Sequence, residues 1–385
     1  MMNFEMDKRE FIKGLGLMQS VAGRKTTLPI LSHILLEWEK NSLYLTGTDL
    51  ETGIREELVA KVHQKGKASV SAKKIYEIVR ELPEETIHIQ EETIHIQKKE
   101  NQWITLQCGK SVFNLAGLDP EEFPSLPNYQ EENFSTVSNR LIREMIEKTV
   151  FAASNEESRY HLNGVLFVQS KHGGKEILRM VATDGHRLSL IDRENQKIRG
   201  IEEKGTIIPK KGVLEIKKII GDREGDAEMG IYFNATHGFF KMGKSLTVIR
   251  LIDGEFPEYE QVIPKGNDKK LAMAKEKMVS SLKRVSTMAS ERMEGVKFSF
   301  KKNLVEMSSY HQDFGDAKEE VEVVYEGPPF QVGFNARYLI EALNVIDAEE
   351  VLMELKDEGS PGILRPSSLA PGLSDQFCII MPMRL

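Results

Sequence analysis

Apolar side chains recur at helical spacing in three segments of the chain, residues 11–22, 142–153 and 278–289. In the first and third segments they follow i, i+4, i+7 and i+11, and the second segment is similar. Each set forms a stripe along one face of an amphipathic helix, and such a stripe needs a partner surface. The first and third segments lie 267 residues apart, which indicates that a longer unit repeats.

Strand-like runs with turn residues between them predict a β-hairpin in three other segments. Residues 34–49 and 164–184 each hold two such runs and end in Thr-Asp, and a degraded copy covers 296–310. The turns are predicted at Lys40-Asn41, His172-Gly173-Gly174 and Lys302-Asn303.

A second helix follows a strand in each unit, within residues 69–82, 207–220 and 332–343. Ser71 and Asn335 are candidate N-caps. The remaining helix has Pro209, which suits a first turn.

Phe-Pro pairs mark the ends of the first two units. They occur in LDPEEFP at 118–124 and in IDGEFP at 252–257, and the two pairs lie 133 residues apart. An extended residue before proline is typical of a segment boundary. The recurring order predicts an α+β chain of three similar domains, 1–129, 130–254 and 255–385.

Composition narrows the class of protein. With 40% hydrophobic and 29% charged residues, the 385-residue chain is typical of globular proteins. The net charge of −7 argues against a wholly basic nucleic-acid coat but allows one basic face. The two cysteines, Cys108 and Cys378, form no CxxC, so a reducing compartment is expected. No secretory signal and no apolar run near 18 residues is visible, so neither secretion nor a membrane span is expected.

The second helices carry basic residues outside their apolar stripes. Lys73 and Arg80 are seven residues apart, and so are the members of two further pairs, Lys210 with Lys217 and Lys211 with Lys218. Seven residues make two helical turns, so each pair shares a face. Solvated helix faces explain this pattern, and so does a shared basic surface that binds one polyanion.

A series of motifs resembles the beta subunit of bacterial DNA polymerase III, the DNA sliding clamp. In chain order they are LPILSHILLE, LTGTDLE, GLDPEEFPSLP, RYHLNGVLF, VATDGHRLS, LIDGEFPEYEQVIP and the terminal MPMRL. The resemblance implies three clamp domains per chain, with helices lining a central channel and antiparallel sheets outside. It implies a cytoplasmic, nucleoid-associated homodimeric ring that encircles duplex DNA without sequence preference.

The same resemblance implies a non-catalytic processivity factor with no cofactor and no metal. Its partners would be the catalytic subunit of DNA polymerase III, the clamp loader, and other polymerases or repair proteins that carry short peptide motifs. The implied peptide pocket between the second and third domains comprises Leu162, Thr183, Gly185, His186, Arg187, Leu188, Pro257, Gln261, Val262, Ile379, Ile380, Met381, Pro382, Met383 and Arg384. Gln261 stands where some relatives have arginine.

Two further sets of residues follow from the resemblance. The loops at the ring face would contact DNA through Arg24, Arg159, Tyr160 and His161, which add to Lys73, Arg80, Lys210, Lys217 and Lys218 on the helices. The subunit contact would bury Phe113 and Leu115, which alternate onto one strand face, against Thr287 and Met288.

Three alternatives compete with this interpretation. An enzyme could use Asp184 and His186 with Asp49, but an Asp and a His two residues apart face opposite sides of a strand, and no HExxH, GxSxG or P-loop occurs. A repeat-built scaffold could bind proteins without encircling DNA. A secondary clamp kept beside a main one would share every motif above.

Residues 84–90 and 91–97 are both EETIHIQ, an immediate tandem duplication. Seven is odd, so the two copies would face opposite sides of one continuous strand. One copy is therefore predicted to occupy the family's strand, and the other to form an extra loop or an extended hairpin.

Overall fold

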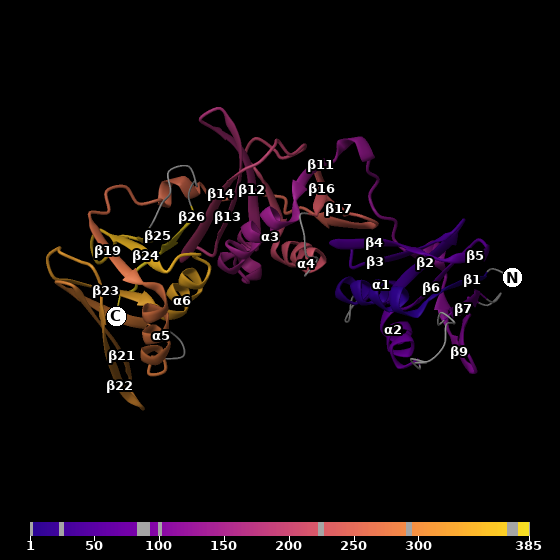
Figure 1. Cartoon of the computed structure of the whole chain (residues 1–385), viewed down its shortest axis with the longest axis horizontal. Helices are drawn as coiled ribbons and strands as arrows, with labels where there is room; N and C mark the ends of the chain where they lie inside the picture. Colours follow the sequence, from indigo (N-terminus) through magenta and orange to yellow (C-terminus); the bar gives the residue numbers. More distant parts are fainter. Residues whose placement is uncertain are drawn as a thin grey trace. The chain divides into compact units, whose positions relative to one another are not determined.

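The computed structural model describes residues 3–22, 27–82, 93–98, 102–221, 227–289, 295–367 and 376–384. The chain divides into two compact units (Figure 1). The first contains Met1–Asn139, Ile198–Gly200 and Glu215–Leu251, and the second contains Arg140–Lys197, Ile201–Leu214 and Ile252–Leu385.

Two antiparallel sheets form the first unit. The nine-stranded sheet has the order β10 (Gly117–Leu118), β6 (Gly66–Ser71), β2 (His33–Glu39), β3 (Ser42–Thr48), β4 (Thr52–Val59), β18 (Ser245–Arg250), β17 (His237–Met242), β16 (Glu228–Phe233) and β11 (Ser135–Ser138). The five-stranded sheet has the order β5 (Lys61–Gln64), β1 (Asn3–Asp7), β7 (Thr93–Lys98), β8 (Ile104–Cys108) and β9 (Ser111–Leu115). Helix α1 (Lys8–Val21) packs on β3, β4 and helix α2 (Ala72–Glu81).

The second unit is built in the same way. Its eight-stranded sheet has the order β15 (Thr206–Pro209), β12 (Gly164–His172), β13 (Lys175–Thr183), β14 (Arg187–Glu194), β26 (Gln376–Ile380), β25 (Gly362–Pro366), β24 (Glu350–Leu355) and β19 (Lys269–Ala274). Its four-stranded sheet has the order β22 (Gly315–Glu322), β21 (Leu304–His311), β20 (Gly295–Lys301) and β23 (Phe330–Asn335). Helix α5 (Lys275–Ser286) packs on β21, β22 and helix α6 (Ala336–Asn344).

One arrangement of strands recurs three times along the chain. A meander with a fourth strand beside it appears as β6-β2-β3-β4, as β15-β12-β13-β14 and as β23-β20-β21-β22. A second group appears as β1-β7-β8-β9, as β11-β16-β17-β18 and as β19-β24-β25-β26. Each meander is preceded by one helix and followed by another; the middle pair is α3 (Asn139–Glu147) and α4 (Lys210–Ile220). These are the hairpins and helices that the sequence predicts.

Antiparallel strand pairs join consecutive repeats into continuous sheets. Strand β4 of the first repeat pairs with β18 of the second, and Gly53 lies opposite Val248. Strand β14 of the second repeat pairs with β26 of the third, and Leu188 lies opposite Ile379. Each compact unit is therefore centred on a sheet shared by two repeats.

Local chemistry explains where the second helices begin. The Ser71 hydroxyl accepts a hydrogen bond from the backbone N–H of Lys74, and the Asn335 side chain accepts one from Tyr338, so both N-cap predictions are confirmed. Pro209 differs from its predicted place by one residue, because it ends β15 and helix α4 begins at Lys210.

The second copy of the duplicated heptapeptide supplies most of strand β7. Thr93–Gln97 pairs in regular antiparallel register with β1, and His95–Lys98 pairs with β8. This agrees with the expectation that one copy occupies a strand. The first copy lies outside the described residues.

Candidate functional site

A tight turn between β13 and β14 presents the sequence Thr183-Asp184-Gly185-His186-Arg187. The Thr183 hydroxyl donates to the backbone carbonyl of Arg187 at 2.6 Å and accepts from the Gly185 N–H at 3.1 Å. Asp184 Oδ1 accepts from the backbone N–H groups of His186 and Arg187 at 2.9 and 3.0 Å. Gly185 has a φ of +88°, where glycine avoids the steric cost of a side chain. Asp184 thus stabilises a turn, which supports its structural role over a catalytic one.

Next to this turn, apolar side chains cover one face of the eight-stranded sheet. Leu188 and Ile379 are buried opposite each other on β14 and β26, in a cluster that also holds Ile363. Phe256 and Tyr259 pack against the same cluster from the chain segment between the second and third repeats. This cluster supplies the apolar floor that the pocket prediction requires.

The C-terminal tail and η6 (Tyr259–Val262) lie beside the floor. The Met381 N–H donates to the His186 carbonyl at 2.9 Å, and the Met383 N–H donates to the Gly333 carbonyl at 2.8 Å, which fixes the tail along the turn. Met381 is 38% exposed and Val262 is 49% exposed, so both keep apolar surface available. Of the other predicted pocket residues, Leu162 is buried, Pro382 is half-buried, and Pro257, Gln261 and Arg384 are exposed. The Gln261 side chain donates to Glu258.

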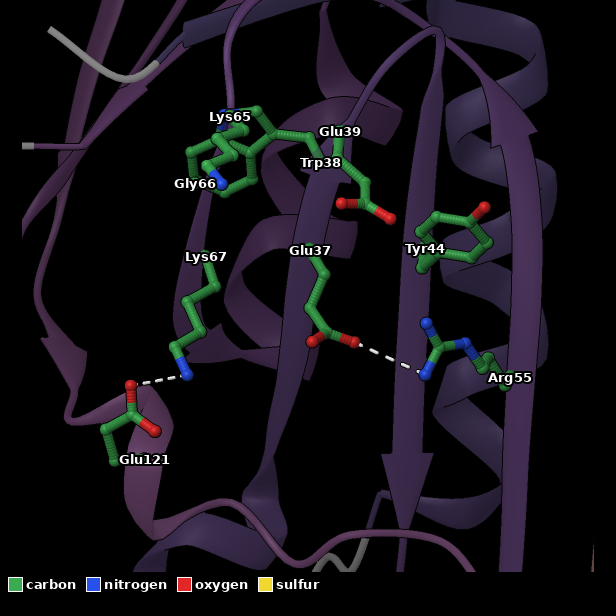
Figure 2. Close-up of a pocket in the computed structure, with 9 residues that line it drawn as sticks. All are labelled: Glu37, Trp38, Glu39, Tyr44, Arg55, Lys65, Gly66, Lys67 and Glu121. Atoms are coloured by element: carbon green, nitrogen blue, oxygen red, sulfur yellow. Dashed lines mark ion pairs between the residues drawn. The ribbon is translucent and has the colours of Figure 1, made fainter. Parts of the chain in front are cut away.

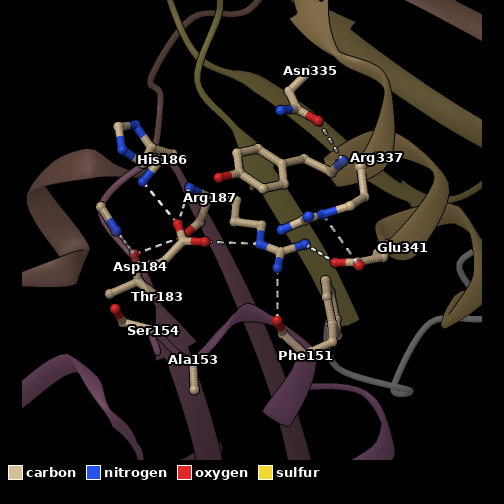
Figure 3. Close-up of polar contacts among 12 residues, drawn as sticks. Phe151, Ala153, Ser154, Thr183, Asp184, His186, Arg187, Asn335, Arg337 and Glu341 are labelled. Atoms are coloured by element: carbon tan, nitrogen blue, oxygen red, sulfur yellow. Dashed lines mark hydrogen bonds and ion pairs between the residues drawn. The ribbon is translucent and has the colours of Figure 1, made fainter. Parts of the chain in front are cut away.

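Arg187 and Ile380 lie on the opposite sheet face from Leu188 and Ile379. The Arg187 side chain is only 6% exposed and is directed toward Glu341 and Phe151 (Figure 3). Strand alternation sends it to the opposite sheet face from Leu188. Ile380 belongs to the core cluster of the third repeat, on the opposite sheet face from Ile379, because successive strand residues alternate in direction. Both support the site from beneath.

Arg187 forms a buried polar network. Its Nε lies 3.1 Å from Asp184 Oδ2, one terminal nitrogen donates to Glu341, and the other donates to the Phe151 carbonyl at 2.8 Å (Figure 3). Its guanidinium also lies 4.4 Å from the centre of the Tyr338 ring. A buried guanidinium must be paired to offset its desolvation, and these contacts tie the turn to α6.

The basic side chains of the second helices are not equivalent. Lys73, Arg80 and Lys218 are exposed, and Lys217 is half-buried. The Lys210 ammonium instead donates to the Ala153 carbonyl at 2.8 Å and to Asn155 Oδ1 at 2.9 Å, and its partial burial lowers the pKa of the amine. The structure therefore gives Lys210 an internal role that helical spacing alone did not reveal.

Alignment of the three repeats explains this difference. Lys210 is the first residue of α4, and the first residues of α2 and α6 are the buried Ala72 and Ala336. One position later come Lys73, Lys211 and Arg337, all exposed. Sequence reasoning missed Arg337, and the repeat offset would have found it.

The predicted ring-face residues fall in η5 (Glu157–Leu162). Arg159 and Tyr160 are exposed, and His161 is half-buried with its ring 5.6 Å from that of Tyr160. Arg159 Nη1 also donates to the Asp184 carbonyl at 3.3 Å, so this loop lies against the turn of the pocket. Arg24 lies outside the described residues.

The predicted contact residues for a second subunit lie at the ends of two sheets. Phe113 and Leu115 are half-buried on β9, the last strand of the five-stranded sheet. Thr287 is exposed just after α5, and Met288 is half-buried close to Gly315, the first residue of β22.

A separate hollow of about 480 Å³ lies on the face of β2, β3 and β4 that carries Tyr44, away from α1 (Figure 2). Two ion pairs line it, Arg55 with Glu37 at 3.4 Å and Lys67 with Glu121. Exposed ion pairs of this kind contribute little to stability, and none of the predicted site residues lies here.

Across the described residues, no group of three or more His, Cys, Asp or Glu side chains is arranged to hold a metal ion.

Three family models match consecutive parts of the chain. They describe the N-terminal, central and C-terminal domains of the DNA polymerase III beta subunit and match residues 2–127, 136–258 and 260–384. The beta sliding clamp of Pseudomonas aeruginosa is 33% identical over 390 residues, and that of Escherichia coli K12 is 31% identical over 390 residues, with both chains fully covered in each case.

Solved structures agree with these sequence matches. The DNA polymerase sliding clamp from Caulobacter crescentus superposes with a TM-score of 0.91 at 32% identity, over the full length of both chains. The sliding clamp from Bartonella birtlesii bound to griselimycin gives 0.91 at 31% identity, again over both full lengths. Fold and matches together define a DNA clamp of three repeated α+β domains.

The chain belongs to the DNA polymerase III beta subunit family, and it is a sliding clamp of the replication machinery. Clamps of this family are processivity factors and are not catalytic, so the chain is not an enzyme. Its partners in general terms are DNA and DNA polymerase. None of the described helices is both long enough and apolar enough to cross a membrane.

Proposed function

We propose that two copies of this chain close into a head-to-tail ring that encircles duplex DNA and tethers the polymerase in the cytoplasm. The observation that carries the proposal is the repeated sheet junction. Strand β4 pairs with β18, and strand β14 pairs with β26. In the third meander the equivalent of β4 and β14 is β22, and in the first repeat the equivalent of β18 and β26 is β9. Within the described residues, β22 pairs only with β21 and β9 pairs only with β8. A second copy would supply the missing partner for each edge, which gives two identical junctions.

The repeat also predicts the register of this junction. The turns CGKS at 108–111 and MGKS at 242–245 are equivalent, which aligns Ser111 with Ser245. Asp316, Gly53 and Leu188 occupy the same position in their meanders. Because Ser245 lies opposite Glu56, and Glu319 is the equivalent of Glu56, Ser111 of one copy is expected opposite Glu319 of the other.

Exposed aromatic side chains support the same junction. Phe314 and Tyr310 are 76% and 70% exposed at the tip of the β21–β22 hairpin. In the proposed register Leu115 lies opposite Gly315, next to Phe314, so dimerisation buries apolar surface that is exposed to water in a single chain. The contact of Phe113 and Leu115 with Thr287 and Met288 belongs to this interface.

The pocket beside the Thr183–Arg187 turn is proposed to bind short peptides of polymerases, the clamp loader and repair proteins. A few large apolar side chains would rest on Leu188 and Ile379, and burying each contributes about 1.5–3 kcal/mol. After the costs of association, the affinity is expected to be about micromolar, which allows partners to exchange.

On the DNA side, Lys73, Arg80, Lys217 and Lys218 are proposed phosphate contacts, joined by Arg159, Tyr160 and His161.

Cysteine cross-linking tests the ring. In a Cys108→Ser background, Ser111→Cys with Glu319→Cys is expected to form an intermolecular disulfide. The Glu57 N–H bonds the Lys244 carbonyl, so the adjacent Ser245–Glu56 pair is of the closely spaced, non-hydrogen-bonded type. The out-of-register pair Asn114→Cys with Glu319→Cys is the control. A mass near twice 43.7 kDa with cross-linking of the first pair supports the ring; a monomer at every concentration, or equal cross-linking of both pairs, contradicts it.

A further inference from the structure

Glu341 lies between two guanidinium groups that belong to different surfaces. One carboxylate oxygen accepts from Arg187, and the other lies 3.7 Å from Nε of Arg337 (Figure 3). The Arg187 side chain is 6% exposed beneath the pocket turn, whereas that of Arg337 is 58% exposed on α6. One carboxylate therefore connects a surface residue of the helix with the buried support of the pocket.

A comparison with the first repeat shows which part of this arrangement is special. Glu77 of α2 occupies the position of Glu341, and its oxygens lie 3.8 Å from Lys73 and 2.9 Å from Lys74. Both partners of Glu77 are on its own helix. In the third repeat Tyr338 replaces the second lysine, its ring lies 4.4 Å from the Arg187 guanidinium, and the carboxylate binds Arg187 instead. The glutamate that forms ion pairs only within its own helix in the first repeat therefore also bonds the Thr183–Arg187 turn in the third repeat.

We propose that Arg337 contacts DNA and that Glu341 transmits this contact to the peptide pocket. The inference rests on the proposed function, because it takes the Lys73 position of each repeat to face DNA. When a phosphate engages Arg337, the attraction of that guanidinium for Glu341 is shared with the phosphate. The Glu341 carboxylate then interacts more strongly with Arg187. This contact holds the Thr183–Arg187 turn in its binding geometry.

Further contacts between the Thr183–Arg187 turn and α6 couple the helix to the pocket. The His186 ring stacks on Tyr338 at 6.4 Å with an interplanar angle of 20°, and His186 also anchors the tail through the Met381 N–H. A firmer Arg187–Glu341 contact therefore orders both sides of the pocket. By linkage, DNA on the clamp tightens peptide binding, and peptide tightens DNA binding by the same factor.

Fluorescence anisotropy of the full-length protein tests this coupling. The probe is a fluorescein-labelled hexapeptide with two leucines and one phenylalanine, titrated with and without a saturating 30-base-pair duplex at low salt. The wild type is expected to bind the peptide about two- to fivefold more tightly with DNA, the range of a partly exposed ion pair. Arg337→Gln and Glu341→Gln should abolish this dependence, and Glu341→Asp should restore part of it. Lys73→Gln is the matched control, because it removes an equivalent DNA contact without a link to the pocket.

The outcomes separate the coupling from the proposed function. If the wild type binds both ligands but its peptide affinity ignores DNA, or if Arg337→Gln keeps the full dependence, the coupling is wrong while the clamp function stands. If the wild type binds neither the duplex nor the peptide, the proposed function fails and the coupling falls with it. Arg337 is exposed and its replacement should leave folding intact, so the test does not depend on the stability of the Glu341 variants.

Discussion

Leu50 and Gly185 occupy the same position of the same turn in successive repeats, and both have left-handed backbones, with φ of +75° and +88°. Each N–H bonds the hydroxyl of a threonine two residues earlier, Thr48 and Thr183, at 3.0 and 3.1 Å. Leucine is strained in this conformation, whereas glycine is not. The turn geometry is thus common to both junctions, and only the second turn leaves the position without a side chain.

Substitutions at these two positions should have opposite effects. Gly185→Ala places a Cβ 3.0 Å from Arg159 Nη1 in a left-handed residue, so it should destabilise the fold by about 1–2 kcal/mol and weaken peptide binding. Leu50→Gly relieves similar strain and should be neutral or slightly stabilising, since the added freedom of the unfolded chain offsets part of the gain. Urea denaturation and peptide titration of both variants measure this. Equal destabilisation by the two changes would contradict the assignment of strain to the turn.

Lys210 and Lys218 provide a matched test of the DNA face. Lys218→Gln should weaken duplex binding and reduce the slope of log affinity against log salt by about 0.9, as expected when one phosphate contact is lost. Lys210→Gln should leave that slope nearly unchanged and instead lower the unfolding free energy by about 1 kcal/mol, because the Ala153 carbonyl loses its partly buried donor. Binding titrations at several salt concentrations decide between them. A larger slope change for Lys210→Gln would overturn the internal role given to that lysine.

Cys378 should react slowly in the native protein. It is fully buried beneath the β14–β26 junction, and burial raises the pKa of its thiol to about 11, against the smaller opposing effect of a hydrogen bond with Ser189. At pH 8 only about one thiol in a thousand is then ionised. Iodoacetamide labelling followed by peptide mass spectrometry should modify Cys378 only after urea unfolding. Rapid labelling of the native chain would show that the junction opens readily.

Glu144 should make the second unit sensitive to acid. Partial burial alone would raise the pKa of its carboxyl, but the hydrogen bond from Arg193 and the charges of Arg193 and Lys148 outweigh it and lower the pKa. A carboxyl whose pKa is depressed by folding stabilises the native state above its unfolded pKa of about 4.3, and this stability is lost as the pH falls through the folded pKa. Wild type should therefore be more stable than Glu144→Gln at pH 7, with the difference shrinking below about pH 4. A difference independent of pH would exclude this explanation.

The sequence predicted the elements better than the directions of individual side chains. Periodicity located the amphipathic helices and the hairpins, because both depend on local spacing, and the Ser71 and Asn335 caps follow from local chemistry. The contacts of Lys210 and Arg187 could not be predicted, for a different reason. Their side chains are held by Ala153 and Glu341, which lie far along the chain, so no local pattern indicates that they point inward.

The predicted pocket residues show the same limit, since the sequence did not reveal the direction of each side chain. The resemblance grouped Ile379 and Ile380 together, yet strand alternation sends them to opposite faces once β26 is known to pair with β14. Arg337 was overlooked because it has no second basic residue seven positions away. Only its equivalence to Lys73 in the repeat brings it to notice.

Encirclement of DNA is the central claim, and retention of a locked ring on capped linear DNA tests it most directly. The Ser111→Cys and Glu319→Cys variant, in the Cys108→Ser background, is threaded onto a bead-tethered duplex. The free end of the duplex is then blocked by a bound antibody, and the disulfides are formed. The protein is washed at about 1 M salt, where phosphate contacts no longer hold it. The ring account predicts that cross-linked dimers stay until a restriction enzyme cuts the duplex and then leave at once. Loss of the cross-linked dimers in the salt wash, before any cut, would contradict encirclement.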